Sequence, residues 1–157
     1  TMELTIEHLA PYLPYGLKGK MNIFGDNQTE VGIEGLSVIG EVELSGIRTT
    51  VNEFFDISEI KPILRTLSDL TKEIEVNGEK FVPIERLKEL FILDKSKCCD
   101  AYQTAFRDIY FDFTEADFKA KILMLPNEWV EVIHSWHFDT KGLIEAGLAI
   151  NYNELNK

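Results

Sequence analysis

Two histidines near the end of the chain, His134 and His137, have the spacing of metal ligands on a helix. Side chains three residues apart share one helix face, and imidazole is a common ligand of zinc and nickel. No cysteine, histidine or acidic residue stands at a recognised spacing to complete a site. In a helical projection His134 points toward water and His137 lies at the edge of the apolar stripe. A partly buried, hydrogen-bonded His137 is the favoured interpretation, and metal binding is the alternative.

Acidic residues form two further groups with possible chemistry. Glu41 and Glu43 alternate with Val42 and Leu44, which predicts a half-buried strand with both carboxylates on one side and Glu34 nearby. The second group consists of Asp108, Asp112, Glu115 and Asp117. Paired carboxylates can hold Mg²⁺ or Ca²⁺ or perform acid–base chemistry, but neither group matches the calcium-loop pattern. A solvated acidic surface is the simpler interpretation of both groups.

Signatures of covalent catalysis and of cofactor binding are missing. The sequence has no G-x-S-x-G, no phosphate loop, no H-E-x-x-H and no G-x-G-x-x-G. Its two cysteines, Cys98 and Cys99, are adjacent, and neighbouring cysteines rarely bridge because the ring is strained. A thiol–imidazole pair with a downstream histidine stays open as an alternative. We expect reduced thiols, no catalytic residue and no cofactor.

The formal net charge of −11 is unevenly distributed. Residues 1–60 contain ten acidic and three basic residues, residues 61–97 seven and eight, and residues 98–157 ten and five. Such a chain repels phosphate backbones, so a basic protein partner is expected and direct nucleic-acid binding is not. No apolar run approaches the ~20 residues of a membrane span. Glu3 and Glu7 stand where a secretion signal would be basic, so we expect a cytoplasmic protein.

The elements that must position these residues predict an α+β fold. In the first third, a short helix over 6–10 capped by Thr5 precedes strands over 17–24, 36–44 and 47–55, and Gly32 and Gly35 mark a turn-rich stretch between the first two strands. This third predicts a small antiparallel sheet packed against several short helices. We expect one compact domain over 1–157, with possible lobes at 1–57, mainly β, and 58–157, mixed and mainly α.

The middle of the chain predicts a hairpin followed by a helix. Asn77-Gly78 separates two short strands, which indicates a type I′ turn, and Pro83 then begins a helix whose apolar stripe is Ile84, Leu87 and Phe91. Before the hairpin, Pro62 suits the first turn of a helix through residue 67, and Ser68 can cap another short helix.

The last third predicts further helices. A strand over 109–113 precedes a helix capped by Thr114 and closed by Pro126; Asn127 caps a helix over 128–136, and Asp139 caps a last helix that Gly147 ends. Residues 148–150 are a final strand or a packed tail. Trp129 and Trp136 lie on one helix face, and core packing is the favoured interpretation over a binding platform.

Seven stretches carry a family resemblance: His8–Leu17, Ile60–Arg65, Leu67–Ile74, Asn77–Pro83, His137–Asp139, Gly142–Glu145 and Gly147–Ile150. Together they cover under half of the chain. They resemble a family of uncharacterised proteins carried by prophages and mobile elements of intestinal anaerobic bacteria, in which Pro often stands in place of Thr66. The resemblance implies a phage-encoded protein in the bacterial host cytoplasm, and it implies no activity and no site residues.

These observations favour a non-catalytic phage accessory protein that binds another protein through an acidic face containing Glu34, Glu41 and Glu43. Two alternatives remain open. One is a small metal-dependent hydrolase that uses Asp108, Asp112 or the pair His134 and His137. The other is an acidic mimic of DNA.

Overall fold

The computed structural model describes residues 2–23, 27–37, 39–45, 54–92, 127–155 and 157. The contacts of the chain divide it into two compact units. Unit 1 consists of Thr1–Arg65 and His134–Lys157, and unit 2 of Thr66–Ile133. Unit 1 contains a six-stranded sheet and short helices, and unit 2 contains a two-stranded hairpin and a longer helix. The α+β class predicted from the sequence is confirmed.

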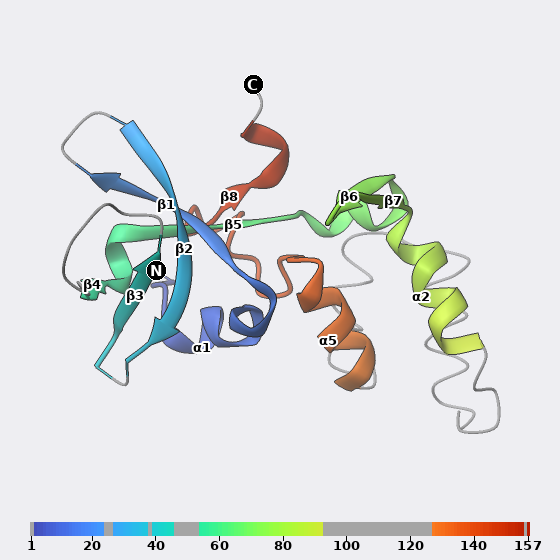
Figure 1. Ribbon diagram of the computed structural model, residues 1–157, viewed down its shortest axis with the longest axis horizontal. Coiled ribbons are helices and arrows are strands. Elements are labelled where there is room, and N and C mark those ends of the chain that lie inside the picture. The colour runs from blue at the N-terminus through green and yellow to red at the C-terminus, as the bar shows by residue number, and fades with distance from the viewer. Residues whose placement is uncertain (1, 24–26, 38, 46–53, 93–126, 156) are drawn as a thin grey trace. The chain divides into compact units, whose positions relative to one another are not determined.

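The sheet of unit 1 has the strand order β4-β3-β2-β1-β5-β8 (Figure 1). Its strands are β1 (Lys18–Ile23), β2 (Asn27–Leu36), β3 (Glu41–Ser45), β4 (Phe54–Asp56), β5 (Ile60–Leu64) and β8 (Ile150–Asn151). All neighbours are antiparallel except β5 and β8, which are parallel. The predicted antiparallel sheet of the first third is therefore present, and the end of the chain adds a parallel strand to it.

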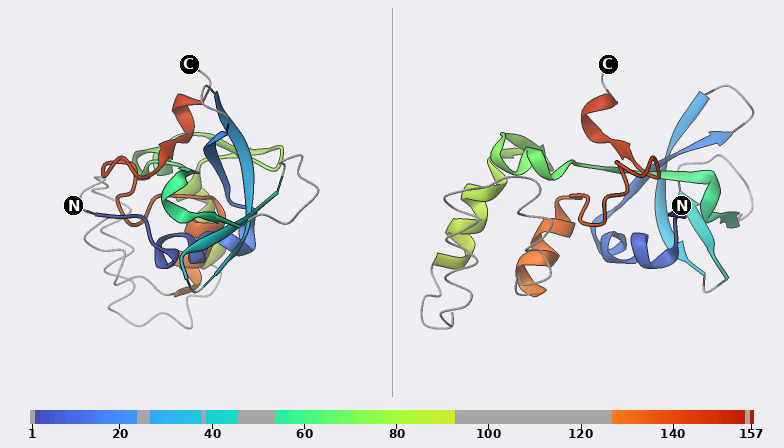
Figure 2. Two further views of the ribbon diagram at one scale, coloured as in Figure 1. Left: turned by 90° about the vertical axis from the view of Figure 1, so that its left-hand side faces the viewer. Right: turned by 180° about the vertical axis from the view of Figure 1, so that it is seen from behind.

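One face of this sheet packs on two short helices, α1 (Ile6–Leu9) and η1 (Ala10–Tyr15) (Figures 1 and 2). Leu9 and Tyr12 are fully buried and share the core with Val31, Ile33 and Val42. The predicted helix over residues 6–10 is thus confirmed and continues as a 3₁₀ turn. We call the sheet face that packs on this core the inner face and the opposite one the outer face.

The stretch predicted to be rich in turns is instead the long strand β2. The strand predicted over 36–44 is present over its second half, in β3, and the chain turns before it, where the Gly40 N–H donates to the Ser37 carbonyl oxygen. Gly32 and Gly35 are strand residues. A Cβ on Gly32 would lie 2.4 Å from the Ser45 hydroxyl oxygen, and one on Gly35 would lie 3.1 Å from a Glu43 carboxylate oxygen. Both glycines therefore make room for side chains of β3, which is a role that local sequence does not reveal.

The predicted helix beginning at Pro62 is also wrong, because residues 60–64 form β5. Ile60 and Leu64 are buried in the core cluster, and Lys61 between them is exposed. Pro62 and Ile63 are buried as well, so most of this strand is covered on both faces, and Pro62 pairs with Gly19 of β1. The following short helix is the 3₁₀ helix η3 (Leu67–Thr71).

The second part of unit 1, His134–Lys157, which we call the closing segment, returns to the end of β5. The backbone N–H of Arg65 donates to the carbonyl oxygen of His137, and the N–H of Asp139 donates to the carbonyl oxygen of Arg65, both at 2.8 Å. The Asp139 carboxylate accepts from the backbone N–H groups of Lys141, Leu143 and Ile144. It organises a series of turns instead of the predicted helix. Gly147 has the expected positive φ of 74°.

The boundary between the two units differs from the predicted lobe boundary, which follows residue 57. Residue 57 begins the 3₁₀ helix η2 (Ile57–Glu59), which joins β4 directly to β5. The contacts divide instead after Arg65 and after Ile133, because the closing segment belongs to the sheet of unit 1. Unit 1 is consequently built from both ends of the sequence.

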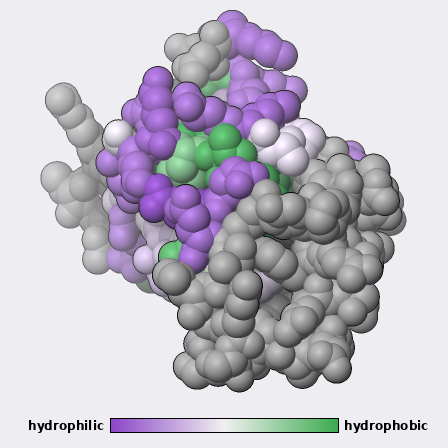
Figure 3. Space-filling view, turned by 90° about the vertical axis from the view of Figure 1, so that its right-hand side faces the viewer, coloured by the Kyte–Doolittle hydropathy of each residue, from purple (hydrophilic) through white to green (hydrophobic). Residues whose placement is uncertain are grey.

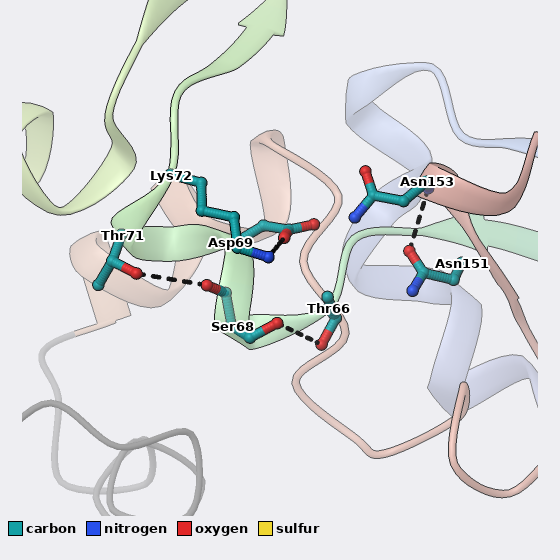
Figure 4. A network of polar contacts seen from close by, with 7 residues as sticks. All are labelled: Thr66, Ser68, Asp69, Thr71, Lys72, Asn151 and Asn153. Carbon is teal, nitrogen blue, oxygen red and sulfur yellow. Dashed lines mark hydrogen bonds and ion pairs between the residues drawn. The ribbon is translucent and has the colours of Figure 1, made fainter. Parts of the chain in front are cut away.

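Unit 2 begins with a polar turn around η3 (Figure 4). The hydroxyl oxygens of Thr66 and Ser68 lie 3.3 Å apart, and the Thr71 hydroxyl donates to the Ser68 carbonyl oxygen. Asp69 is buried, and its carboxylate accepts from the Lys72 ammonium at 2.9 Å. Figure 4 also shows the cap of η5 (Tyr152–Glu154) in unit 1, where the Asn151 side chain accepts from the Asn153 backbone N–H.

The predicted hairpin and helix of unit 2 are confirmed. Strands β6 (Ile74–Val76) and β7 (Glu79–Phe81) pair around Asn77 and Gly78, whose φ angles are 53° and 82°, as a type I′ turn requires. Helix α2 (Pro83–Ile92) then buries Ile84 and Leu87. The third predicted stripe residue, Phe91, lies outside the side chains that the structure describes.

Helix α5 (Asn127–Ser135) begins at the predicted cap and continues into the closing segment. Trp129 is 6% exposed and Trp136 is 9% exposed, which confirms that both are core residues. The strand predicted over 109–113 and the helix predicted between Thr114 and Pro126 lie outside the described residues, as does most of the strand predicted over 47–55.

The hairpin turn gives the first testable prediction. A Cβ on Gly78 would have no heavy atom within 4 Å, so a substitution there meets only the cost of a positive φ. We expect Gly78→Val to destabilise the protein by about 1–3 kcal/mol, because a β-branched residue resists this conformation. Gly78→Asn is the matched control and should cost less, since asparagine tolerates left-handed backbone. Urea denaturation of both variants checks this, and equal losses of stability would contradict the turn type.

Candidate functional site

The three predicted acidic residues all lie on the outer face of the sheet. On β3, Val42 is buried and Leu44 packs against the core, so the alternating residues Glu41 and Glu43 point the other way. On β2, Glu34 is exposed and its carboxylate accepts from the Ser45 hydroxyl at 2.6 Å. Ser45 belongs to β3, so this bond joins the two strands across the outer face.

Two further carboxylates extend this group. Glu30 is exposed on β2, and Asp56 is exposed on β4 opposite Glu41 in the strand register. The Ser58 side chain and backbone N–H donate to Asp56, which lowers the pKa of its carboxyl group. We call Glu30, Glu34, Glu41, Glu43 and Asp56 the acidic patch. No Lys or Arg occurs in the residues of β2, β3 and β4 themselves.

The lysines on the rest of the outer face were not anticipated from the sequence. Lys18 and Lys20 alternate on β1 with inward-facing Gly19 and Met21, and Lys61 is exposed on β5. In the register, Lys20 lies between Glu30 of β2 and Lys61 of β5. The outer face therefore changes sign between β2 and β1, and the acidic patch occupies the half formed by β2, β3 and β4.

A pocket of 310 Å³ opens on the outer face beside Gly32. The register places Lys18 of β1 and Ser45 of β3 on either side of this glycine. Along β2, Glu30 and Glu34 are the nearest residues on the same face, about 13 Å apart in an extended strand. We call it the glycine pocket; its lining is completed by Gly16, Leu17 and Val31.

Each carboxylate of the glycine pocket has a neighbour that fixes its position. The Lys18 ammonium donates to Glu30 at 2.9 Å, and this hydrogen bond raises the pKa of Lys18. Both side chains are well exposed, so the ion pair contributes at most ~1 kcal/mol. Glu34 is positioned by Ser45 alone among the described hydrogen bonds. Because a carboxylate has about four acceptor positions, Glu34 can accept further donors.

His134 is buried, and the prediction that it points toward water is wrong. Its Nε2 atom lies 2.8 Å from the Thr140 hydroxyl oxygen, and its ring meets the Tyr12 ring edge-on at 4.9 Å between centroids. Burial lowers the pKa of His134 to about 4, with a smaller contribution from Lys141. The helical projection failed because it considers the helix alone, whereas a residue from the N-terminal segment covers this side.

His137 is half-buried and hydrogen-bonded, in agreement with the favoured interpretation. Its Nε2–H donates to the Tyr15 carbonyl oxygen at 2.9 Å, and burial lowers its pKa. Its φ of 61° lies in the left-handed region, which residues other than glycine rarely adopt. The two histidines therefore contact different partners. Within the described ranges, no three His, Cys, Asp or Glu side chains are grouped as a metal site would need.

Tyr12 connects the N-terminal and closing segments of unit 1. Its hydroxyl donates to the carbonyl oxygen of Phe138 at 2.7 Å and lies 3.4 Å from the backbone nitrogen of Thr140. Burial raises the pKa of Tyr12 to about 12. Tyr12 and His134 thus belong to one buried network, and this network holds two chain segments together.

Several candidates from the sequence lie outside the described residues: Cys98, Cys99, Asp108, Asp112, Glu115 and Asp117. Where the structure is described, none of the helices has the length and apolar character needed to cross a membrane. The coloured part of the side shown in Figure 3 is mostly hydrophilic, with a small apolar group among polar residues.

The buried histidine predicts a specific pH dependence. The folded-state pKa of His134 lies below its ordinary value of 6.5, so neutral His134 favours the folded state and protonation favours unfolding. Its contribution to stability is complete above pH 6.5 and is lost as the pH falls toward 4. We expect His134→Gln, which does not titrate, to lose less stability than the wild type across this interval. Urea denaturation at successive pH values measures the difference, and parallel curves would contradict it.

The comparisons with known proteins contribute no relative. No family model matches the chain, and no curated protein or solved structure matches it either. The functional argument therefore depends on the outer face and its geometry.

Proposed function

We propose that this chain is a non-catalytic protein-binding module whose acidic patch binds a basic surface of another protein. The observation that carries the proposal is the position of the acidic patch: five carboxylates lie on the outer face of β2, β3 and β4, opposite the core. A field of one sign over a surface accelerates encounter with a partner of opposite sign and helps to select it.

The state of the other reactive side chains also favours binding over catalysis. His134, His137 and Tyr12 each have hydrogen-bond partners within unit 1. His134 and Tyr12 are buried, so neither presents a reactive atom to a dissolved substrate. Their arrangement supports a structural role.

The family resemblance supplies the setting of the proposal. A phage-encoded protein would meet its partner in the cytoplasm of the bacterial host. A mimic of DNA is less well supported than a protein-binding surface, because Lys18, Lys20 and Lys61 share the outer face and would repel a DNA-binding groove. The partner is accordingly a protein with a basic patch small enough to lie over β2, β3 and β4.

Site-specific photocrosslinking can identify the partner. Phe54 is 54% exposed and pairs with Glu43 in the register, so benzoylphenylalanine at position 54 would carry its photoreactive group over the acidic patch without entering the core. The same probe at Tyr15, an exposed aromatic residue of η1, is the control. A protein crosslinked from position 54 and not from position 15 would then be purified for direct binding measurements.

Charge reversal tests the proposal with that purified partner. We expect Glu41→Lys with Glu43→Lys to weaken binding at least tenfold at ~0.1 M salt, mainly by slowing association, with a smaller difference at high salt. The matched control is Glu3→Lys with Glu7→Lys, which makes the same change of charge at exposed positions of the N-terminal segment. Equal effects of the two double variants would mean that only net charge matters, and the proposal would fail.

A further inference from the structure

The glycine pocket has a size that suits a single side chain. Gly32 lines it between Glu30 and Glu34, and the Ser45 hydroxyl lies over the side of Gly32 where a Cβ would stand. Its sides are Lys18 and Ser45 from the neighbouring strands. At 310 Å³, the pocket is at the lower end of the range for small-molecule sites, which suits a single side chain or a ligand of similar size.

The lining of the glycine pocket selects a cation. It contains one lysine and two glutamates, which leaves one net negative charge. The Lys18 ammonium is held by Glu30 at 2.9 Å. Glu34 is held by a hydroxyl group, which is neutral and leaves the charge of the carboxylate uncompensated. A cation entering the pocket therefore meets the Glu34 carboxylate.

We infer that the glycine pocket receives an arginine side chain of the partner, whose guanidinium group binds the Glu34 carboxylate. This inference rests on the proposed function and names the chemistry by which the partner is recognised. A planar guanidinium can donate two parallel hydrogen bonds to one carboxylate. A lysine ammonium is more strongly hydrated and acts as a point charge, so it fits this geometry less well.

The position of Ser45 makes the pocket specific to this arrangement. Its hydroxyl lies 2.6 Å from the Glu34 carboxylate and orients it along the edge of the pocket. A methyl group on Gly32 would lie 2.4 Å from that hydroxyl oxygen and 3.3 Å from the Glu34 carboxylate. Gly32→Ala would thus displace the hydroxyl group that positions Glu34.

The first experiment uses N-acetyl-arginine amide as the probe and the whole chain labelled with ¹⁵N. We expect saturable chemical-shift changes at the amides of Gly16, Gly32 and Ser45, which surround the pocket. The citrulline analogue has the same shape without the charge and should bind at least tenfold more weakly. Equal binding of the two amides, or shifts scattered over the surface, would overturn the inference. Inorganic phosphate shifting the same amides would also overturn it, because the pocket would then select an anion through Lys18.

Variants locate the binding group. We expect Glu34→Gln to weaken arginine amide roughly tenfold, because it keeps an acceptor for Ser45 and removes the charge. Glu41→Gln makes the same change in the acidic patch outside the pocket and should have little effect. Similar losses in both variants would overturn the inference. Gly32→Ala should abolish binding, and the Glu34 comparison decides the matter if that variant does not fold.

The purified partner separates this inference from the proposed function. If the reversal of Glu41 and Glu43 abolishes partner binding while Glu34→Gln leaves it unchanged, the pocket assignment is wrong and the acidic patch remains the binding surface. If arginine amide binds the pocket but the reversal leaves partner binding unchanged, the proposed function is wrong and the pocket remains a guanidinium site.

Discussion

The burial of Val31 and Ile33 against the N-terminal helices determines which residues of β2 lie on the outer face. Both residues are 2% exposed and belong to the core of unit 1. Successive side chains of a strand point to opposite faces, so Glu30, Gly32 and Glu34 have no other place than the outer face. A shift of one residue would bury both carboxylates and expose both apolar residues. The acidic character of the surface is thus a direct consequence of how the inner face packs.

The inner face in turn depends on a buried connection between distant parts of the sequence. The Tyr12 hydroxyl donates to the Phe138 carbonyl oxygen, and the Arg65 backbone forms hydrogen bonds with the residues on either side of Phe138. His134 and Asp139 complete this region from the closing segment. Desolvation explains the lowered pKa of His134 and the raised pKa of Tyr12, because each neutral form is favoured where water is excluded. Unusual pKa values here accompany architecture and need no reaction to explain them.

Local sequence was sufficient where a structure depends on local chemistry. The Asn77-Gly78 turn and the helix beginning at Pro83 are specified by residues that tolerate positive φ or suit a first helical turn, and both are present. It was insufficient where a distant segment decides. Gly32 and Gly35 resemble turn residues until the side chains of β3 occupy the space above them. The placement of Glu41 and Glu43 on one side of a strand followed from alternation, whereas the glycine pocket required the register of three strands.

The same strand register gives the acidic surface specific features in addition to its charge. A row of carboxylates on a flat sheet would attract any basic protein, with little dependence on its shape. The glycine pocket lies beside that row, and Ser45 holds one carboxylate at its edge. On the other side, Lys18 and Lys20 mark where the attraction ends. Long-range attraction comes from the acidic patch, and selection comes from the glycine pocket and the change of sign beside it. Both follow from the pairing of β1, β2 and β3.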